Sequence, residues 1–244
     1  MRPASRHRSP FVTSAHAGVL FLDEFPLFRT DVIDALREPL ESGEVTVSRT
    51  EESVTLPAGA MVVVASNPCP CGRFHVSPAL DRCECTEVRR RRYRSRIAGP
   101  VTDRIDITRH VEPLRRGDHD PFTETETSAQ VRVRVAAARE RQAARYAAER
   151  WRLNGQATGP GLVQRHPLAD DAARDLLSEA VLSGRLSNRG ATRVHRVAWT
   201  VADLASVRAG VDVVPGVHEV EVALRLRTGE SLPSAAVRPR AGRR

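Results

Sequence analysis

Two short apolar runs, each followed closely by acidic or amide residues, restrict the possible fold of this chain more than any other feature. The first run, VLFL at 19–22, is followed directly by Asp23 and Glu24. The second run, MVVVA at 61–65, is separated from Asn67 by one residue. Uninterrupted apolar runs of this length are typical of parallel strands buried on both faces. We therefore predict a parallel α/β sheet whose strands end in polar side chains, at the edge where such sheets bind ligands.

The remaining pattern adds a hairpin and a second, helical part. Residues 30–41 place apolar side chains on one helical face, and Pro39 should kink or end that helix. Residues 43–57 alternate as two short strands about a polar tip, which predicts a hairpin. A third strand is expected near 105–111. Helical periodicity then predicts helices at about 128–150, 169–183, 187–207 and 215–227.

These patterns divide the chain into an α/β core and an all-α part. The segment between them is polar and contains Pro and Gly, and both termini are basic and expected to be disordered. The predicted boundaries are a disordered N-terminus at 1–15, the core at 16–115, a linker at 116–127, the all-α part at 128–227 and a disordered tail at 228–244.

Composition excludes some classes of protein and leaves others open. No apolar run approaches the length of a membrane span, and the N-terminus lacks the apolar stretch of a secretory signal, so we expect a cytoplasmic protein without a membrane partner. The net charge of +8 favours a polyanion such as nucleic acid as partner. All 38 basic residues are Arg and none is Lys, however, so a coding bias explains the charge equally well.

Four cysteines gather in one short stretch. They form two C-x-C pairs separated by eleven residues, and a cluster of this kind in a chain without a signal peptide indicates a metal site or free thiols. Four thiolates suit tetrahedral zinc, although one residue between paired ligands is tighter than the common spacing. Reduced structural thiols are the alternative, and His75 could replace one thiolate. The candidate zinc ligands are Cys69, Cys71, Cys83 and Cys85.

The polar residues after the two apolar runs suit nucleotide hydrolysis. Asp23 would hold magnesium, usually through water, and Glu24 would polarise the attacking water. Asn67 could orient the same water or touch a terminal phosphate. Each residue also has an ordinary explanation, because many strands end in acids that meet solvent and Asn-Pro often opens a turn.

The order of these segments carries a family resemblance. GVLFLDEF, DALREPLESGEV, VVVASNPCPCG, GPVTDRIDI and LSNRGATRVHRVAWTVADL follow one another along the chain. Together they resemble the ComM/YifB family of magnesium-chelatase-like AAA+ ATPases over about residues 16–227. The resemblance implies an incomplete AAA+ P-loop-type parallel sheet followed by an all-α helical lid.

The resemblance also implies roles for particular residues. Asp23 and Glu24 match the Walker B pair, and Asn67 matches sensor 1. Arg104 matches the arginine finger, whose planar donors stabilise charge on a phosphoryl group bound to the neighbouring subunit. The alternative for Arg104 is a simple ion pair with Asp103 or Asp106.

A second arginine of the resemblance lies in the predicted lid. Arg189 matches the sensor-2 arginine that contacts the nucleotide. Arg193 and Arg196 share its helix face and remain rivals for that role.

Two basic segments are candidate DNA contacts. The hairpin tip carries Arg49, but its sequence SRTEES is more acidic than a DNA-gripping tip should be. RRRRYRSR at 89–96 could follow a phosphate backbone through Arg91 and Arg92, with Tyr93 stacking on a base. A solvated helix face explains this second segment equally well.

The chain lacks a phosphate-binding loop, because it contains neither GxxxxGK nor any Lys. The N-terminal Lon-protease-like domain of the family is missing as well. We therefore expect a truncated or mis-started product, a degenerate remnant, or a partner half that is separately encoded.

The function implied by the resemblance is ATP- and Mg²⁺-dependent remodelling of DNA by a homo-hexameric ring, such as branch migration during transformation or recombination. The alternatives are magnesium insertion into a porphyrin and a non-enzymatic module that binds DNA or caps a ring.

Overall fold

The computed structural model describes residues 11–49, 52–96, 101–112 and 126–232. The chain forms two compact regions that divide after Ile105, here called the strand-bearing region and the helical region. Most of the predicted disordered N-terminus, the hairpin tip, most of the linker and most of the tail lie outside the described residues. Among the described residues, no helix is both long and apolar enough to span a membrane.

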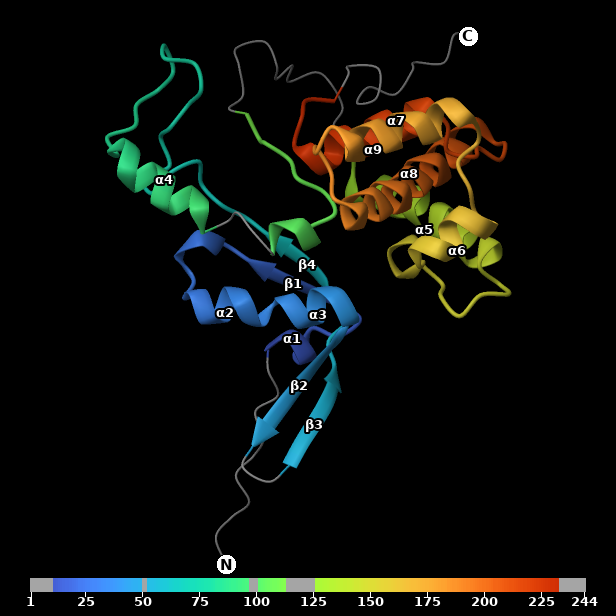
Figure 1. Cartoon of the computed structure of the whole chain (residues 1–244), viewed down its shortest axis with the longest axis horizontal. Coiled ribbons are helices and arrows are strands. Elements are labelled where there is room, and N and C mark those ends of the chain that lie inside the picture. The colour runs from blue at the N-terminus through green and yellow to red at the C-terminus, as the bar shows by residue number, and fades with distance from the viewer. Residues whose placement is uncertain (1–10, 50–51, 97–100, 113–125, 233–244) are drawn as a thin grey trace, which may run out of the picture. The chain divides into compact units, whose positions relative to one another are not determined.

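The predicted parallel strands pair directly with each other. β1 (Val19–Leu22) and β4 (Met61–Val64) run parallel, with Val19 opposite Met61 and Leu22 opposite Val64. Figure 1 shows the two strands side by side in the strand-bearing region. The ladder continues past the strand ends, because the Ala65 N–H donates to the Leu22 carbonyl at 2.9 Å. The prediction of a parallel α/β core is therefore confirmed.

Burial of these strands differs from the prediction. Within the described residues, a cluster that includes Phe25, Ile33 and Leu36 covers one face of the pair. Side chains on the other face are largely exposed: Val19 is 60%, Met61 59% and Phe21 58% exposed. The expectation that both faces are buried was wrong, because an apolar run records what a strand can bury but not which neighbours are present to cover it.

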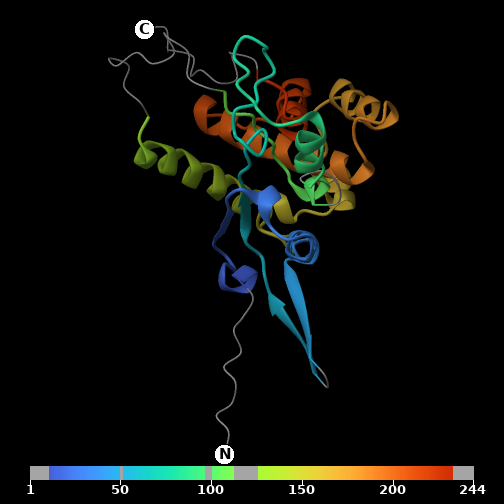
Figure 2. The same ribbon diagram turned by 90° about the vertical axis from the view of Figure 1, so that its left-hand side faces the viewer.

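The segment after β1 forms two short helices and a hairpin. α2 (Thr30–Ala35) ends four residues before Pro39, where a proline ring would collide with the carbonyl of a continuing helix. α3 (Arg37–Ser42) follows and ends at Gly43, whose φ of 73° is easy for glycine. The predicted hairpin is present as β2 (Glu44–Arg49) and β3 (Glu52–Pro57), and Figure 2 shows it as a two-stranded arm.

Three other features depart from the predictions. The described residues include no strand at 105–111; the Thr108 N–H instead donates to the Leu226 carbonyl of the last helix, at 2.7 Å. Helix α6 (Gly159–Arg165) was not among the predicted elements, and α4 (Glu87–Ser95) corresponds to the helix considered as an alternative for 89–96. A short helix, α1 (Phe11–Ser14), lies in the segment predicted to be disordered.

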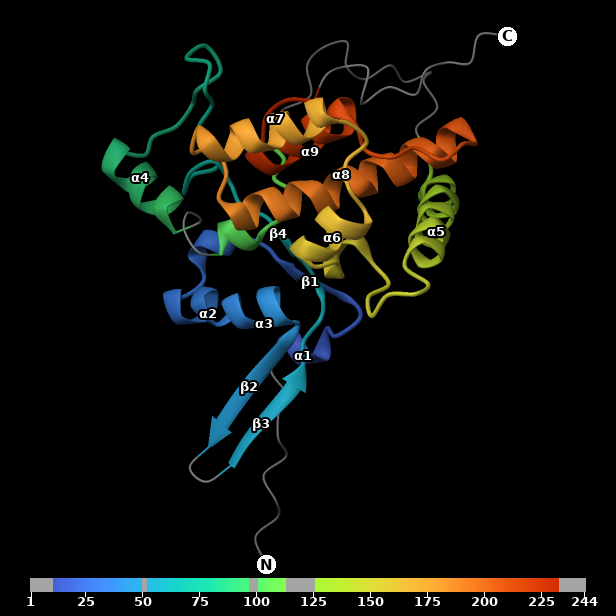
Figure 3. The ribbon, with the colours of Figure 1, turned by 45° about the vertical axis from the view of Figure 1, so that its right-hand side comes forward.

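The helical region packs around one long helix. α8 (Asn188–Ala209) contacts α5 (Ser128–Arg145), α7 (Asp171–Leu182) and α9 (Val217–Thr228), as Figure 3 shows. Side-chain N-caps begin α5, α6, α7 and α8, at Thr127, Thr158, Asp170 and Ser187. The core includes completely buried side chains at Leu162, Val194 and Val220.

A buried polar network crosses the interior of the helical region. The Arg145 guanidinium forms an ion pair with Asp203 and lies over the Trp199 ring, 3.9 Å from its centroid. Asn154 donates to Asp203 at 3.0 Å and accepts a hydrogen bond from the Tyr146 hydroxyl at 2.9 Å. These partners satisfy the Asp203 carboxylate, which could not otherwise be buried without a large cost.

Candidate functional site

The acid pair lies where β1 ends and the chain turns sharply. The Glu24 backbone N–H donates to Oδ1 of Asp23 at 2.8 Å, and both side chains are exposed. Glu24 itself adopts a left-handed conformation, with φ 49° and ψ 40°. This region is unfavourable for a residue with a side chain, by about 1–3 kcal/mol where the surroundings impose it. Phe25 supplies that restraint, because its ring is buried and its N–H donates to the Ala65 carbonyl at 2.9 Å.

Asn67 lies beyond the end of the neighbouring strand. Because Leu22 and Val64 are opposite each other in parallel strands, the residues that follow them leave the same edge of the sheet. The Asn67 side chain is exposed at this edge, as are those of Asp23 and Glu24. The structure therefore brings the three predicted residues to adjoining strand ends.

Tyr93 is a buried residue of α4. The side chain is only 6% exposed, so the predicted stacking of its ring on a base is wrong. Burial raises the pKa of Tyr93, the Asn67 backbone opposes this rise, and the charges of Glu24 and Cys69 add to it. The pKa of Tyr93 therefore responds to both the acid pair and the cysteine cluster.

Arg104 has a partner that sequence proximity did not suggest. It ends a short 3-10 turn, Thr102–Arg104, and its side chain is 13% exposed. Nη2 and Nε donate to Oε2 of Glu41 on α3, at 2.5 and 3.1 Å. Asp106, considered as a partner from the sequence, instead forms an ion pair with Arg193 at 2.7 Å.

The three arginines considered for sensor 2 differ in their surroundings. Arg189 is exposed in the first turn of α8. Arg193 is buried in its pair with Asp106, and Arg196 donates to the Ala157 carbonyl at 2.8 Å. Of the three, Arg189 is the exposed guanidinium, which favours it over the two rivals.

The candidate DNA contacts lie on two separate elements. Arg91 and Arg92 are exposed on α4, which begins at the N-cap Thr86. Arg90 faces the cysteine loop instead, since its guanidinium pairs with Glu87 and lies over the Phe74 ring. Arg49 is the last residue of β2, and its side chain lies outside the described part of the chain.

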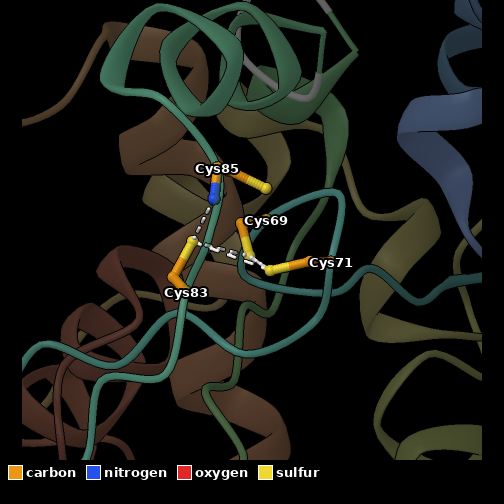
Figure 4. Close-up of side chains that lie close together, drawn as sticks. All are labelled: Cys69, Cys71, Cys83 and Cys85. Atoms are coloured by element: carbon orange, nitrogen blue, oxygen red, sulfur yellow. Dashed lines mark hydrogen bonds between the residues drawn. The ribbon is translucent and has the colours of Figure 1, made fainter.

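The side chains of the four cysteines lie close together, as Figure 4 shows. All four sulfur atoms lie within 4.8 Å of one another. The sulfurs lie 3.3 Å apart from Cys69 to Cys71, 3.5 Å from Cys69 to Cys83 and 3.7 Å from Cys71 to Cys83. Such distances exclude disulfide bonds, which need about 2.05 Å. His75 is directed to its own loop, where Nδ1 accepts from the Ser77 N–H at 2.9 Å.

Two of the thiols have shifted pKa values in opposite directions. Backbone N–H groups of Arg73 and Glu84 lower the pKa of Cys71 to about 6. Burial raises the pKa of Cys85 to about 11. The Cys85 N–H also donates to the sulfur of Cys83 at 3.4 Å. The loop therefore supplies donors to sulfur, as loops that hold thiolates do.

Comparison with known proteins identifies the class to which this arrangement belongs. Residues 4–119 match the family described as magnesium chelatase, subunit ChlI, and residues 125–227 match the C-terminal part of the same subunit. The chain belongs to the magnesium-chelatase-like AAA+ family, in the branch that includes YifB and ComM.

Individual relatives support this assignment. The chain is 40% identical over 222 residues to an uncharacterised protein of Mycobacterium tuberculosis, covering 88% of this chain and 41% of the relative. It is 38% identical over 194 residues to YifB of Escherichia coli, covering 79% and 37%. It is 37% identical over 194 residues to the competence protein ComM of Haemophilus influenzae, covering 79% and 36%. The chain therefore spans about two fifths of the length of these relatives.

Proposed function

We propose that this chain supplies the hydrolysis and sensing residues of an ATP-driven machine that remodels DNA. Asp23 holds magnesium through water, Glu24 polarises the attacking water, and Asn67 orients that water or the terminal phosphate. The observation that carries the proposal is the position of these three exposed side chains at adjoining ends of two parallel strands. Carboxylate and amide groups at that edge can face one metal–triphosphate.

Arg104 has a role between subunits in this proposal. Its guanidinium reaches the nucleotide of a neighbouring copy in a homo-hexameric ring and stabilises charge on the transferring phosphoryl group. The ion pair with Glu41 keeps the guanidinium oriented while no neighbour is present. Arg189 contacts the nucleotide from the helical lid.

Binding of the phosphates needs residues outside this sequence, since it contains no GxxxxGK. We propose that a P-loop segment beyond the given sequence extends the sheet and covers its open face. The exposed side chains Val19, Phe21 and Met61 support the second part, because parallel sheets are normally covered on both faces. The greater length of the relatives is consistent with such a segment.

DNA as the substrate is supported by charge and by the printed name of one relative. ComM of H. influenzae is called a competence protein. The exposed Arg91 and Arg92 on α4 offer phosphate contacts, and the β2–β3 arm with Arg49 is a second candidate. DNA binding that is salt-sensitive but independent of nucleotide would favour a non-enzymatic binding module instead.

The test combines this chain with the P-loop-bearing part of YifB from E. coli and measures ATP hydrolysis with DNA present. We expect hydrolysis only in the mixture. Glu24→Gln should lower kcat by about 10²-fold or more while ATP still binds, because the water loses its base. Asp31→Asn, which changes an exposed acid of α2, is the matched control. Equal rates for the two variants would exclude the assigned role of Glu24.

Magnesium insertion into a porphyrin is the second candidate. It is favoured by the description of the matching family as a magnesium chelatase subunit. In this case the same ATPase residues would drive a chelatase rather than a DNA remodeller. A porphyrin-metallation assay with chelatase partner subunits separates the two, since DNA should stimulate only the first activity.

A further inference from the structure

The cysteine cluster has the dimensions of a tetrahedral thiolate site. Zinc bonds to sulfur at about 2.3 Å, so the sulfurs of a tetrahedral site lie about 3.8 Å apart. The separations among the sulfurs of Cys69, Cys71 and Cys83 are 3.3, 3.5 and 3.7 Å, and all four sulfurs lie within 4.8 Å of one another. A single ion at the centre requires only small movements of these side chains.

The loop between the cysteine pairs is folded in a way that presents the sulfurs together. Gly72 turns the chain after the first pair with a φ of 75°, which a glycine adopts without strain. The Arg82 N–H donates to the Arg73 carbonyl at 3.2 Å and closes the loop. Asp81 Oδ1 accepts from the backbone N–H groups of His75 and Cys83, at 3.3 and 3.0 Å. These contacts position the second cysteine pair opposite the first.

Charge around the cluster is also appropriate for bound thiolates. Four thiolates and one divalent cation carry a net charge of −2, which requires nearby donors or cations. The Arg90 guanidinium is one such cation: it pairs with Glu87 and lies over the ring of Phe74 in the cysteine loop, 4.9 Å from the ring centroid. The N–H of Cys85 donates to the Cys83 sulfur at 3.4 Å.

The cluster joins the segment that follows β4 to the segment that leads into α4. Cys69 follows Asn67 by two residues, directly after β4. Cys85 precedes Thr86, the N-cap of α4. The same helix carries Tyr93, whose side chain is buried. A crosslink at the cysteines therefore fixes the loop that follows Asn67 against the start of α4.

We propose that Cys69, Cys71, Cys83 and Cys85 bind one Zn²⁺, and that the bound ion holds the loop that follows Asn67 against the start of α4. The zinc site stands on the sulfur geometry alone. The significance of holding this loop rests on the proposed function.

Metal content tests whether the four cysteines bind zinc. The full chain, purified reduced and without chelators, should contain one zinc per chain by mass spectrometry. Replacement by Co²⁺ should give the intense visible bands of tetrahedral cobalt thiolate. Cys71→Ser and Cys83→Ser should each lose the metal, whereas His75→Ala, a change in the same loop, should retain it. A cobalt titration of the unaltered chain reads the stoichiometry even if a cysteine variant does not fold.

Two results would overturn the zinc site. The first is reduced wild-type chain that contains no zinc and gives no cobalt bands. The second is a loss of metal in His75→Ala as large as in the cysteine variants.

Hydrogen exchange, measured without nucleotide, tests whether the bound ion holds the loop at Asn67 in place. Chelation of zinc should speed amide exchange at residues 65–72 by about tenfold or more and leave the middle of α8 unchanged. Unchanged exchange at 65–72 after chelation would overturn the positioning role. Neither measurement involves ATP, so failure of the ATPase proposal is read separately.

Discussion

The two regions of this chain bury their apolar residues in different ways. In the helical region, Leu162, Val194 and Val220 are completely enclosed, and the central helix is covered on several sides. In the strand-bearing region, the β1–β4 pair packs one face on α2 and α3 while Val19, Phe21 and Met61 are exposed. The helical region therefore has a core of its own, whereas the strand pair has a face suited to a further layer.

The largest effect is expected from the buried ion pair of the helical region. Asp203→Ala should lower the free energy of unfolding by about 3–5 kcal/mol, because it leaves the Arg145 charge without its partner. Chemical denaturation followed by tryptophan fluorescence measures this, since both tryptophans lie in this region. Asp212→Ala is the control: Asp212 pairs with Arg141 but its side chain is 94% exposed, so the loss should stay below about 1 kcal/mol. Similar losses of unfolding free energy in the two variants would contradict the conclusion that the helical region has a core of its own.

A pair of apolar truncations compares the two regions directly. Leu162→Ala should cost about 2–5 kcal/mol, because it leaves a cavity in a closed core. Phe21→Ala should change the stability of the strand-bearing region by no more than about 0.5 kcal/mol, because its ring is already exposed. Hydrogen exchange by mass spectrometry reads each region separately. A large loss for Phe21→Ala would mean that something covers this face in solution.

Helix caps give a smaller, local comparison. Ser187 accepts from the Gly190 N–H at 3.0 Å at the start of α8, and Thr86 accepts from the Arg89 N–H at 3.3 Å at the start of α4. Replacing either by Ala should cost about 0.5–2 kcal/mol. We expect Ser187→Ala to destabilise the whole helical region and Thr86→Ala to loosen only α4 and the cysteine loop. Exchange rates of α8 and α4 amides in each variant measure this, and a global response to Thr86→Ala would contradict it.

The smallest effect concerns pH. Burial lowers the pKa of His195 below the usual value of 6.5, so the unfolded chain binds the proton more readily than the folded one. This contribution to stability is present above about pH 6.5 and is lost as the pH falls through the lowered pKa. The midpoint of denaturation of the helical region should therefore decrease below pH 6.5, with a shallower slope in His195→Gln. His218→Gln, at an exposed position, should keep the wild-type slope.

Local sequence patterns predicted which helices and strands form better than they predicted what surrounds each of them. The alternation of 43–57 and the 3.6-residue periodicity after 128 are properties of the segments themselves, and the hairpin and four helices lie close to the predicted positions. The exposed face of β1 could not be predicted, because it depends on which neighbours are present.

In the candidate site, too, local features were predicted and long-range partners were not. The acids and the amide were recognised because they follow apolar runs, and their adjacency follows from parallel pairing. The partner of Arg104 was missed, since Glu41 lies 63 residues away and no local signal connects them. Tyr93 was misinterpreted because an aromatic in a basic run is equally compatible with a nucleic-acid contact and with burial. The C-x-C spacing did identify which sulfurs meet.

The left-handed backbone at Glu24 determines how this position can vary over evolutionary time. Asparagine, aspartate and glycine adopt that conformation most readily, while valine, isoleucine and threonine are almost excluded from it. In a copy released from selection on its chemistry, this glutamate could therefore be replaced by asparagine, aspartate or glycine without disturbing the turn. Retention of glutamate in a set of homologues would then reflect demand for its longer carboxylate rather than any preference of the backbone.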